Sequence, residues 1–155
     1  MAKTNAVRML ESAGIDFIIH DYDVSDGAIS GVAVASKIGI DPERVFKTLV
    51  TEGKNTGHNV FVIPCNTELD LKKAAHVAGD KSIEMIKSRD LEPITGYVHG
   101  GCSPIGMKKQ FPTYIDETAI LYDTICVSGG RVGLQVEIAP ADLKRMADSE
   151  YGDLS

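Results

Sequence analysis

A strand-like segment that contains a charged residue constrains the fold of this chain most strongly. Residues 45–50 read Val-Phe-Lys-Thr-Leu-Val, and β-branched and aromatic residues in such a run favour a β-strand. Because side chains alternate between the faces of a strand, Lys47 shares a face with Val45 and Leu49, and the opposite face is apolar too. A strand covered on both sides leaves the Lys47 ammonium in need of an anion, a hydrogen-bonding site or a water-filled cleft. Lys47 is therefore either a lysine whose tip reaches solvent or the cation of a binding site.

The length and composition indicate one ordinary globular domain that spans residues 1–155. Hydrophobic residues make up 43% of the chain and charged residues 25%, and no stretch approaches the length of a transmembrane helix. The first residues lack the apolar core of a signal peptide. The three cysteines are widely spaced, which favours reduced thiols over a disulfide framework. We therefore expect a cytoplasmic protein without a membrane partner, and the scattered histidines predict neither a metal site nor a cofactor.

The net charge argues against a protein that grips nucleic acid over its whole surface. The charge is −6 at pH 7, whereas phosphate binding gains affinity from each phosphate that a basic group neutralises. Any nucleic-acid contact must therefore use a local basic patch, although such patches are also typical of ordinary solvated surface. The candidate patches are Lys72-Lys73, Lys108-Lys109 and the group of Lys81, Lys87 and Arg89.

Strands outnumber long helices and do not alternate regularly with them. Capping residues and apolar spacing predict helices over residues 4–13, 30–37, 71–78 and 141–147. Strands are expected over residues 17–22, 45–50, 60–63, 113–116, 125–127 and 134–138, with a short strand and a short helix within 81–91. This order predicts a mixed α/β fold: a partly closed, barrel-like mixed β-sheet surrounded by helices, in a single domain.

Two glycine-rich loops are candidate binding elements. The first runs from Gly100 to Gly106, and its glycines and proline could present backbone N–H groups to an anionic oxygen. The second, Ser128-Gly129-Gly130, lies where a hairpin turn is required, so it is either a plain turn or part of a pocket. Neither loop fits the glycine pattern of a dinucleotide-binding fold or a P-loop.

A protein nucleophile is only weakly suggested. Cys102 and Ser103 lie in the first glycine loop, three and four residues after His99. Cysteine–histidine catalysis requires that the imidazole reach the thiol and that a third group orient it. A thiol hydrolase that uses Cys102 is therefore one hypothesis, and it predicts that Cys102→Ser abolishes activity.

Taken together, several short motifs resemble the YbaK/EbsC family, which includes free-standing deacylases related to the editing insertion of bacterial prolyl-tRNA synthetases. The motifs follow the family's order and span roughly residues 4 to 148. They are Val45-Phe46-Lys47-Thr48-Leu49, Asp70-Leu71-Lys72-Lys73, Thr95-Gly96-Tyr97, Gly100-Gly101-Cys102-Ser103-Pro104-Ile105-Gly106 and Val127-Ser128-Gly129-Gly130.

The resemblance is strongest to the Cys-tRNA(Pro) deacylase type, and it implies release of a mischarged amino acid from the tRNA 3′ end. The reaction would need no metal, and the substrate's own thiol would attack its carbonyl. Lys47 and Tyr22 match the catalytic positions. The matching substrate-binding positions are Gly100, Gly101, Cys102, Ser103, Gly106, Ser128, Gly129, Gly130 and Gln135.

Two residues depart from the family pattern. Cys102 stands where a small apolar residue is expected, and Gln135 stands where the cysteine-specific branch commonly has an aspartate. Gln135 can accept a hydrogen bond but brings no charge, so the amino acid removed is open. The expected partners are mischarged tRNA and prolyl-tRNA synthetase. The lysines expected to contact the acceptor stem of the tRNA are Lys72, Lys73, Lys108 and Lys109. The alternative function is a non-catalytic binding module for a small amino acid, nucleotide or peptide on the same fold.

Overall fold

Side-chain caps fix the ends of the main helices. A computed structural model of the chain describes residues 3–155, so the first two residues of the predicted domain lie outside it. Helices α1 (Asn5–Ser12), α2 (Gly31–Ile38) and α3 (Leu71–Ala78) each follow a side chain that accepts a hydrogen bond from the first turn. The capping residues are Thr4, Ser30 and Asp70. These three predicted helices are confirmed to within one or two residues at each end.

The remaining elements are short. They are α4 (Leu91–Thr95), α5 (Pro140–Met146), and the 3₁₀ turns η1 (Pro42–Arg44), η2 (Ser88–Asp90) and η3 (Glu117–Leu121). The strands are β1 (Phe17–Asp21), β2 (Phe46–Gly53), β3 (Gly57–Pro64), β4 (Ile83–Met85), β5 (Thr113–Asp116), β6 (Ile125–Ser128), β7 (Leu134–Ile138) and β8 (Ser149–Gly152). All except β8 lie where the sequence predicts a strand. Within residues 3–155, no helix has both the length and the apolar character needed to cross a bilayer.

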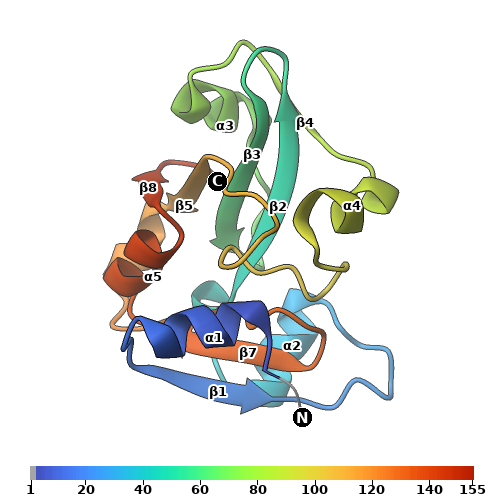
Figure 1. Ribbon diagram of the computed structural model, residues 1–155, viewed down its shortest axis with the longest axis vertical. Coiled ribbons are helices and arrows are strands. Elements are labelled where there is room, and N and C mark those ends of the chain that lie inside the picture. Colours follow the sequence, from blue (N-terminus) through green and yellow to red (C-terminus); the bar gives the residue numbers. More distant parts are fainter. Residues whose placement is uncertain (1–2) are drawn as a thin grey trace.

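The strands form two sheets (Figure 1). The first is antiparallel, with strand order β1-β7-β6, and the second is mixed, with strand order β4-β2-β3-β5-β8. In the second sheet β2 pairs antiparallel with β3 and β4, whereas β3, β5 and β8 run parallel. The mixed α/β single-domain prediction is thus confirmed.

The prediction of one partly closed, barrel-like sheet is not confirmed, because no closed barrel is found in residues 3–155. The two sheets meet at a single parallel bridge between Val45 and Cys126. The Cys65 amide donates a hydrogen bond to the Val45 carbonyl at 2.7 Å, so from this point β2 pairs with β3. Its pairing with β6 ends at the bridge. One bridge is too little pairing to join two ladders into a single sheet.

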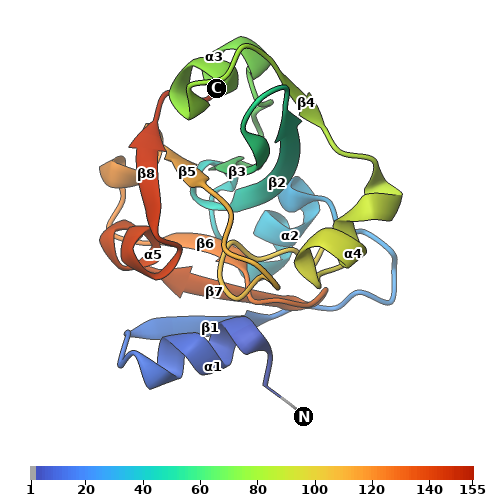
Figure 2. The same cartoon turned by 45° about the horizontal axis from the view of Figure 1, so that its top comes forward.

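The largest core lies between the two sheets. Phe46, Val62 and Ile115 of the five-stranded sheet pack in one cluster with Val136 of the three-stranded sheet and Leu10 of α1. Figures 1 and 2 place α1 along the three-stranded sheet and α3 at the opposite end of the molecule, beside β2 and β3. Both faces of β2 are therefore covered, as its sequence predicts.

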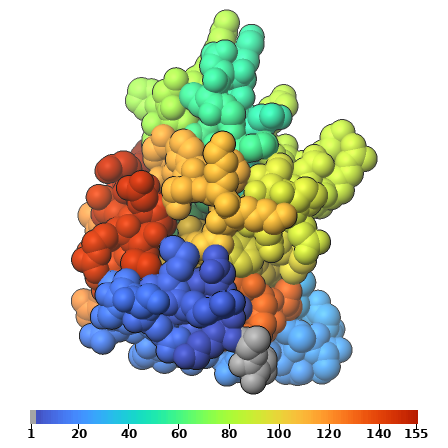
Figure 3. Space-filling model, viewed as in Figure 1, coloured from blue at the N-terminus to red at the C-terminus, as the bar shows by residue number. Residues whose placement is uncertain are grey.

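The end of the β2–β3 hairpin projects from the molecule and is tied to the loop after α3. Figure 3 shows the hairpin and this loop side by side at the projecting end. The Asp80 carboxylate accepts hydrogen bonds from the Thr56 hydroxyl, the Thr56 amide and the Asn55 amide. These bonds, that of the Thr56 hydroxyl first, hold the pKa of Asp80 well below its usual range.

A buried carboxylate fixes the C-terminal tail. Asp116 is 1% exposed and accepts a 3.0 Å hydrogen bond from the amide of Leu154, whose side chain lies fully buried in the core beneath α3. Replacing Asp116 with Ala leaves the Leu154 amide without its acceptor, so we expect the free energy of unfolding to fall by about 1–3 kcal/mol. Urea unfolding measures the change. The exposed Asp123→Ala variant is the control, expected within about 0.5 kcal/mol of wild type; equal losses in both variants would contradict the assignment.

Candidate active site

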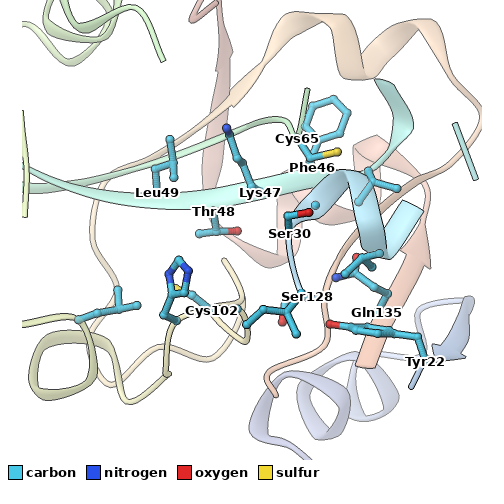
Figure 4. A pocket seen from close by; sticks show the side chains of 17 residues that line it. Tyr22, Ser30, Phe46, Lys47, Thr48, Leu49, Cys65, Cys102, Ser128 and Gln135 are labelled. Atoms are coloured by element: carbon cyan, nitrogen blue, oxygen red, sulfur yellow. The ribbon is translucent and has the colours of Figure 1, made fainter. Parts of the chain in front are cut away.

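A pocket of about 200 Å³ opens where β2 and β6 separate (Figure 4). Its walls come from β2, the ends of β1 and β6, the start of β7, helix α2 with the residues before it, and the first glycine loop. The seventeen lining residues are Tyr22, Ile29, Ser30, Gly31, Val34, Val45, Phe46, Lys47, Thr48, Leu49, Cys65, Leu91, His99, Gly100, Cys102, Ser128 and Gln135.

At Thr48, the edge of β2 that faces this pocket has no partner strand. The Cys65 amide donates a hydrogen bond to the Val45 carbonyl. Because main-chain groups alternate between the two edges of a strand, the N–H and carbonyl groups of Lys47 and Leu49 also point toward β3. The main-chain N–H and carbonyl of Thr48 therefore face the other edge, where β4 pairs only with Thr51–Gly53. Side chains alternate across the same strand, so Lys47 and Thr48 leave it on opposite sides (Figure 4). The pocket consequently receives groups from both faces of β2 and from its edge.

Lys47 supplies an unpaired cation to the pocket. Within residues 3–155 its ammonium forms neither a hydrogen bond nor an ion pair, whereas the Lys37 ammonium donates to the Asp26 carboxylate at 2.8 Å and to two carbonyls. Burial raises the pKa of the Cys65 thiol on the pocket wall, and the nearby charge of Lys47 opposes that rise. The ammonium is thus free to contact an anionic or strongly polar ligand.

Three buried polar atoms without a protein partner line the same pocket. They are the Tyr22 hydroxyl, Thr48 Oγ1 and Gln135 Oε1, and the part of the chain that the structure describes contains no other such side-chain atom. A buried polar atom without a partner costs about 1–3 kcal/mol, so folded proteins rarely leave one unsatisfied. Their presence on one cavity indicates a site that a polar ligand completes.

The structure brings six of the predicted site residues together on the pocket wall, and five are not part of its lining. Those on the wall are Tyr22, Lys47, Gly100, Cys102, Ser128 and Gln135; the other five are Gly101, Ser103, Gly106, Gly129 and Gly130. A Cβ at Gly101 would lie 2.9 Å from the backbone of Arg131, so Gly101 allows the two glycine loops to touch. The Gly101 amide donates to the Val98 carbonyl and the Gly130 amide to Ser128 Oγ, which leaves both engaged within the loops.

None of the four lysines predicted to contact tRNA lines the pocket. Lys72 and Lys73 belong to α3, and the Lys73 ammonium binds the Asp153 carboxylate at 3.2 Å. Lys109 lies over the ring of Phe111, with its nitrogen 5.9 Å from the ring centre. Contact of these lysines with tRNA stays a prediction.

Cys102 is poorly suited to act as a nucleophile. Its side chain is on the pocket wall but only 8% exposed, and burial raises the pKa of its thiol to about 12. The thiolate is the reactive form, so almost none is present at neutral pH. His99 lines the pocket as well, but within residues 3–155 no hydrogen bond joins it to Cys102.

Sequence reasoning missed several wall residues, of which Thr48 matters most. Thr48 is adjacent to Lys47, but side chains alternate along a strand, so the two side chains lie on opposite faces. A pocket confined to the Lys47 face would not include Thr48. The sequence predicts Ser30 only as the first residue of a helix and Leu91 as the end of a segment of mixed character, and neither pattern indicates a pocket.

A second polar cluster lies on β1, β6 and β7 beside the pocket. The Glu137 carboxylate accepts hydrogen bonds from Thr124 Oγ1 at 2.6 Å and Arg44 at 3.4 Å, and lies 2.8 Å from His20 Nε2. His20, Glu137 and Cys126 each place a possible metal ligand within 4.8 Å of the others. Because burial raises the pKa of Cys126 to about 12 and Arg44 brings a positive charge, the donor set fits a cation poorly. Sequence spacing could not bring these residues together, because only the strand pairing does so.

Comparison with known proteins places the chain in a family of editing domains. A family model for the aminoacyl-tRNA editing domain matches residues 28–146, so the chain belongs to this family. It is 47% identical, over 99% of its length and 93% of the relative's, to the Enterococcus faecalis protein named "Putative Cys-tRNA(Pro)/Cys-tRNA(Cys) deacylase EbsC".

More distant relatives share the domain. The chain is 27% identical to the proline–tRNA ligase of Shouchella clausii over 68% of its own length, which is 19% of the ligase. The solved structure entitled "Crystal structure of a putative trans-editing enzyme for prolyl tRNA synthetase" has a TM-score of 0.85 at 22% identity, and the match covers 100% of this chain and 99% of that one. This last likeness shows the fold alone.

The hydrogen bonds to Glu137 make a pH-dependent contribution to stability. The Thr124 hydroxyl and His20 lower the pKa of the Glu137 carboxyl below its usual value of 4.5. A carboxyl with a lowered pKa stabilises the fold above its unfolded pKa, and that contribution is lost as the pH falls through the folded value. We expect Glu137→Gln to reduce the free energy of unfolding by about 1–3 kcal/mol at pH 6, with the difference from wild type shrinking below about pH 4. Urea unfolding across this range measures it, and the exposed Glu68→Gln variant reports the effect of removing one negative charge by itself.

Proposed function

We propose that this chain is a trans-editing deacylase that releases a mischarged amino acid, most readily cysteine from Cys-tRNA(Pro), from the 3′ end of the tRNA. The observation that carries the proposal is the pocket itself, where the unpaired Lys47 ammonium joins three buried polar atoms that lack a protein partner. Family membership and the name of the Enterococcus relative support the same reaction class.

The wall residues fit the chemistry of an aminoacyl ester. Such an ester is already activated, so positioning and stabilisation of the developing oxyanion can supply most of the acceleration. Lys47 is the candidate catalytic cation for the ester carbonyl, and the free main-chain N–H of Thr48 is a second donor on the same strand. Tyr22, Ser128 and Gln135 form the polar wall that holds the acyl group, with Gly100 and Cys102 completing its shape.

The substrate can provide its own nucleophile. The cysteinyl thiol loses its proton, and its sulfur forms a bond to the ester carbonyl carbon. The bond from that carbon to the ribose oxygen then breaks, and this oxygen takes up a proton to restore the tRNA hydroxyl. The products are a cysteine thiolactone and free tRNA, and the step uses neither a metal nor a protein thiol. A thiol held beside its own carbonyl has a very high effective concentration, which explains why no activated protein nucleophile is needed.

Delivery of the tRNA calls for a partner. The chain carries a net charge of −6, which opposes strong binding of a polyanion. We propose that prolyl-tRNA synthetase presents the mischarged tRNA in the cytoplasm, and that Lys72, Lys73, Lys108 and Lys109 contribute weak contacts to the acceptor stem. Such contacts would be screened by salt.

Loss of the pocket cation tests the proposal. We expect Lys47→Ala to slow the release of labelled cysteine from Cys-tRNA(Pro) by about 100-fold or more, because one electrostatic stabiliser of the transition state is removed. Lys47→Arg keeps the charge but changes the donor geometry, so it should retain part of the rate.

The matched control is Lys54→Ala, which removes an exposed lysine from the turn between β2 and β3. It should release cysteine at the wild-type rate. Parallel reactions with Ala-tRNA(Pro), each with and without prolyl-tRNA synthetase, identify the amino acid removed. Saturable binding without release from either tRNA would contradict the proposal and favour the binding-module alternative, and full activity of Lys47→Ala would overturn the site assignment.

A second variant separates this proposal from a protein-thiol mechanism. Because the Cys102 thiol has a pKa of about 12 and is protonated at neutral pH, Cys102→Ser should keep the rate of cysteine release within about threefold of wild type. The rate is measured under single-turnover conditions. Loss of nearly all activity in Cys102→Ser, with an unchanged melting temperature, would instead establish Cys102 as the nucleophile.

A further inference from the structure

The pocket contains a cation but no carboxylate. Among its seventeen lining residues, drawn from the described part of the chain, there is one lysine and one histidine, and neither aspartate nor glutamate. An aminoacyl ester carries an α-amino group, which is positively charged when protonated. Nothing on the wall offers such an ammonium a counter-ion, and Lys47 brings a charge of the same sign into the same cavity.

Among the described residues around Gln135, no carboxylate is free to pair with an ammonium. Gln135 is 6% exposed, and its Oε1 has no protein partner. It pairs with His20 of β1 and Ser128 of β6 across the sheet, and its own strand carries Glu137 two residues on. The Glu137 carboxylate is already bound to Thr124, His20 and Arg44. The other titratable groups in reach of the cavity are Tyr22, Lys47, Cys65, His99 and Cys102.

We propose that this site recognises the α-substituent of the acyl group in an uncharged form, as a neutral amine or a hydroxyl, rather than as an ammonium. The inference rests on the proposed function, because it assigns the acyl group to this pocket. It makes Gln135 a specificity-determining residue, and it extends the substrate class from aminoacyl esters to α-hydroxyacyl esters.

The three unpartnered polar atoms match an uncharged group. A neutral amine and a hydroxyl can each donate one hydrogen bond and accept another. Gln135 Oε1 is an acceptor for that donor, and the Tyr22 and Thr48 hydroxyls can donate to its lone pair. An ammonium could also donate to these three oxygens. It has no lone pair for the hydroxyl protons, however, and it would bring a charge without a counter-ion into a buried cavity.

Binding of two matched ligands at different pH values tests the inference. The probes are 3′-amino-3′-deoxyadenosine acylated through an amide with alanine or with lactate, which cannot be hydrolysed as esters and differ only in the α-amine or α-hydroxyl. Calorimetry between pH 6 and 9 gives each Kd. We expect the alanyl probe to weaken by about tenfold per pH unit below the amine pKa of about 8, because only the free base binds. The lactyl probe has no group that titrates there, so any change in its Kd with pH comes from the protein. Dividing the alanyl Kd by the lactyl Kd removes that contribution.

Two variants at one position separate charge from hydrogen bonding. Gln135→Glu supplies the missing counter-ion. At pH 6 the ratio of the lactyl Kd to the alanyl Kd should therefore be at least about tenfold higher for this variant than for wild type. Gln135→Met removes the acceptor without adding charge and should weaken both probes while leaving the pH dependence of their ratio unchanged. If Gln135→Glu does not fold, the comparison of the two probes on wild-type protein decides by itself.

The outcomes distinguish this inference from the function beneath it. The inference would be overturned if the ratio of the alanyl Kd to the lactyl Kd were smaller below pH 7 than above pH 8. The failure of both probes to bind a protein that still releases cysteine from Cys-tRNA(Pro) would also overturn the inference. Absence of both binding and release would overturn the proposed function together with it.

Discussion

The single bridge between Val45 and Cys126 is the constraint on which the rest of the structure depends. It is where the backbones of the two sheets pair, and beyond it β2 stays paired with β3 while β6 stays paired with β7. The space opened by that separation is the pocket. Its walls are anchored in separate cores, since Val45 packs with Cys126 and Ala35, and Phe46 packs between the sheets. A site held by two buried strands keeps its geometry without a ligand, as electrostatic stabilisation of a transition state requires.

Within residues 3–155, the buried side-chain oxygen and nitrogen atoms that lack a hydrogen-bond partner all belong to residues of this pocket. The Asp116 carboxylate and the Thr51 hydroxyl are buried, and each has its hydrogen-bond partner. Tyr22, Thr48 and Gln135 do not, although each unsatisfied atom costs about 1–3 kcal/mol. A folded protein keeps such atoms unpaired where a bound molecule supplies the partners, and the loss in free energy of unfolding is recovered on binding.

Local patterns in the sequence predict most of the helices and strands. Asp70 and Gly79 mark both ends of α3, because an N-cap side chain and a left-handed C-cap glycine act over one helical turn. The missed features are all long-range. Strand β8 has no distinctive pattern and exists because it pairs parallel with β5, and the separation of the sheets depends on which strand Val45 joins. The site was predictable where motifs encode it, at Lys47 and Gly100. It was not predictable at Thr48, whose role follows from an unpaired strand edge.

The two faces of β2 divide the tasks of the site. Lys47 leaves one face and Thr48 the other, and Figure 4 shows Tyr22, Ser128 and Gln135 on the Thr48 side of the strand. In the proposed function, charge stabilisation and recognition of the acyl group would therefore fall on opposite sides of one strand. Since alternation along a strand has a period of two, a shift of β2 by a single residue would exchange the two sides, so the pairing with β3 that fixes its register also fixes the chemistry of the pocket.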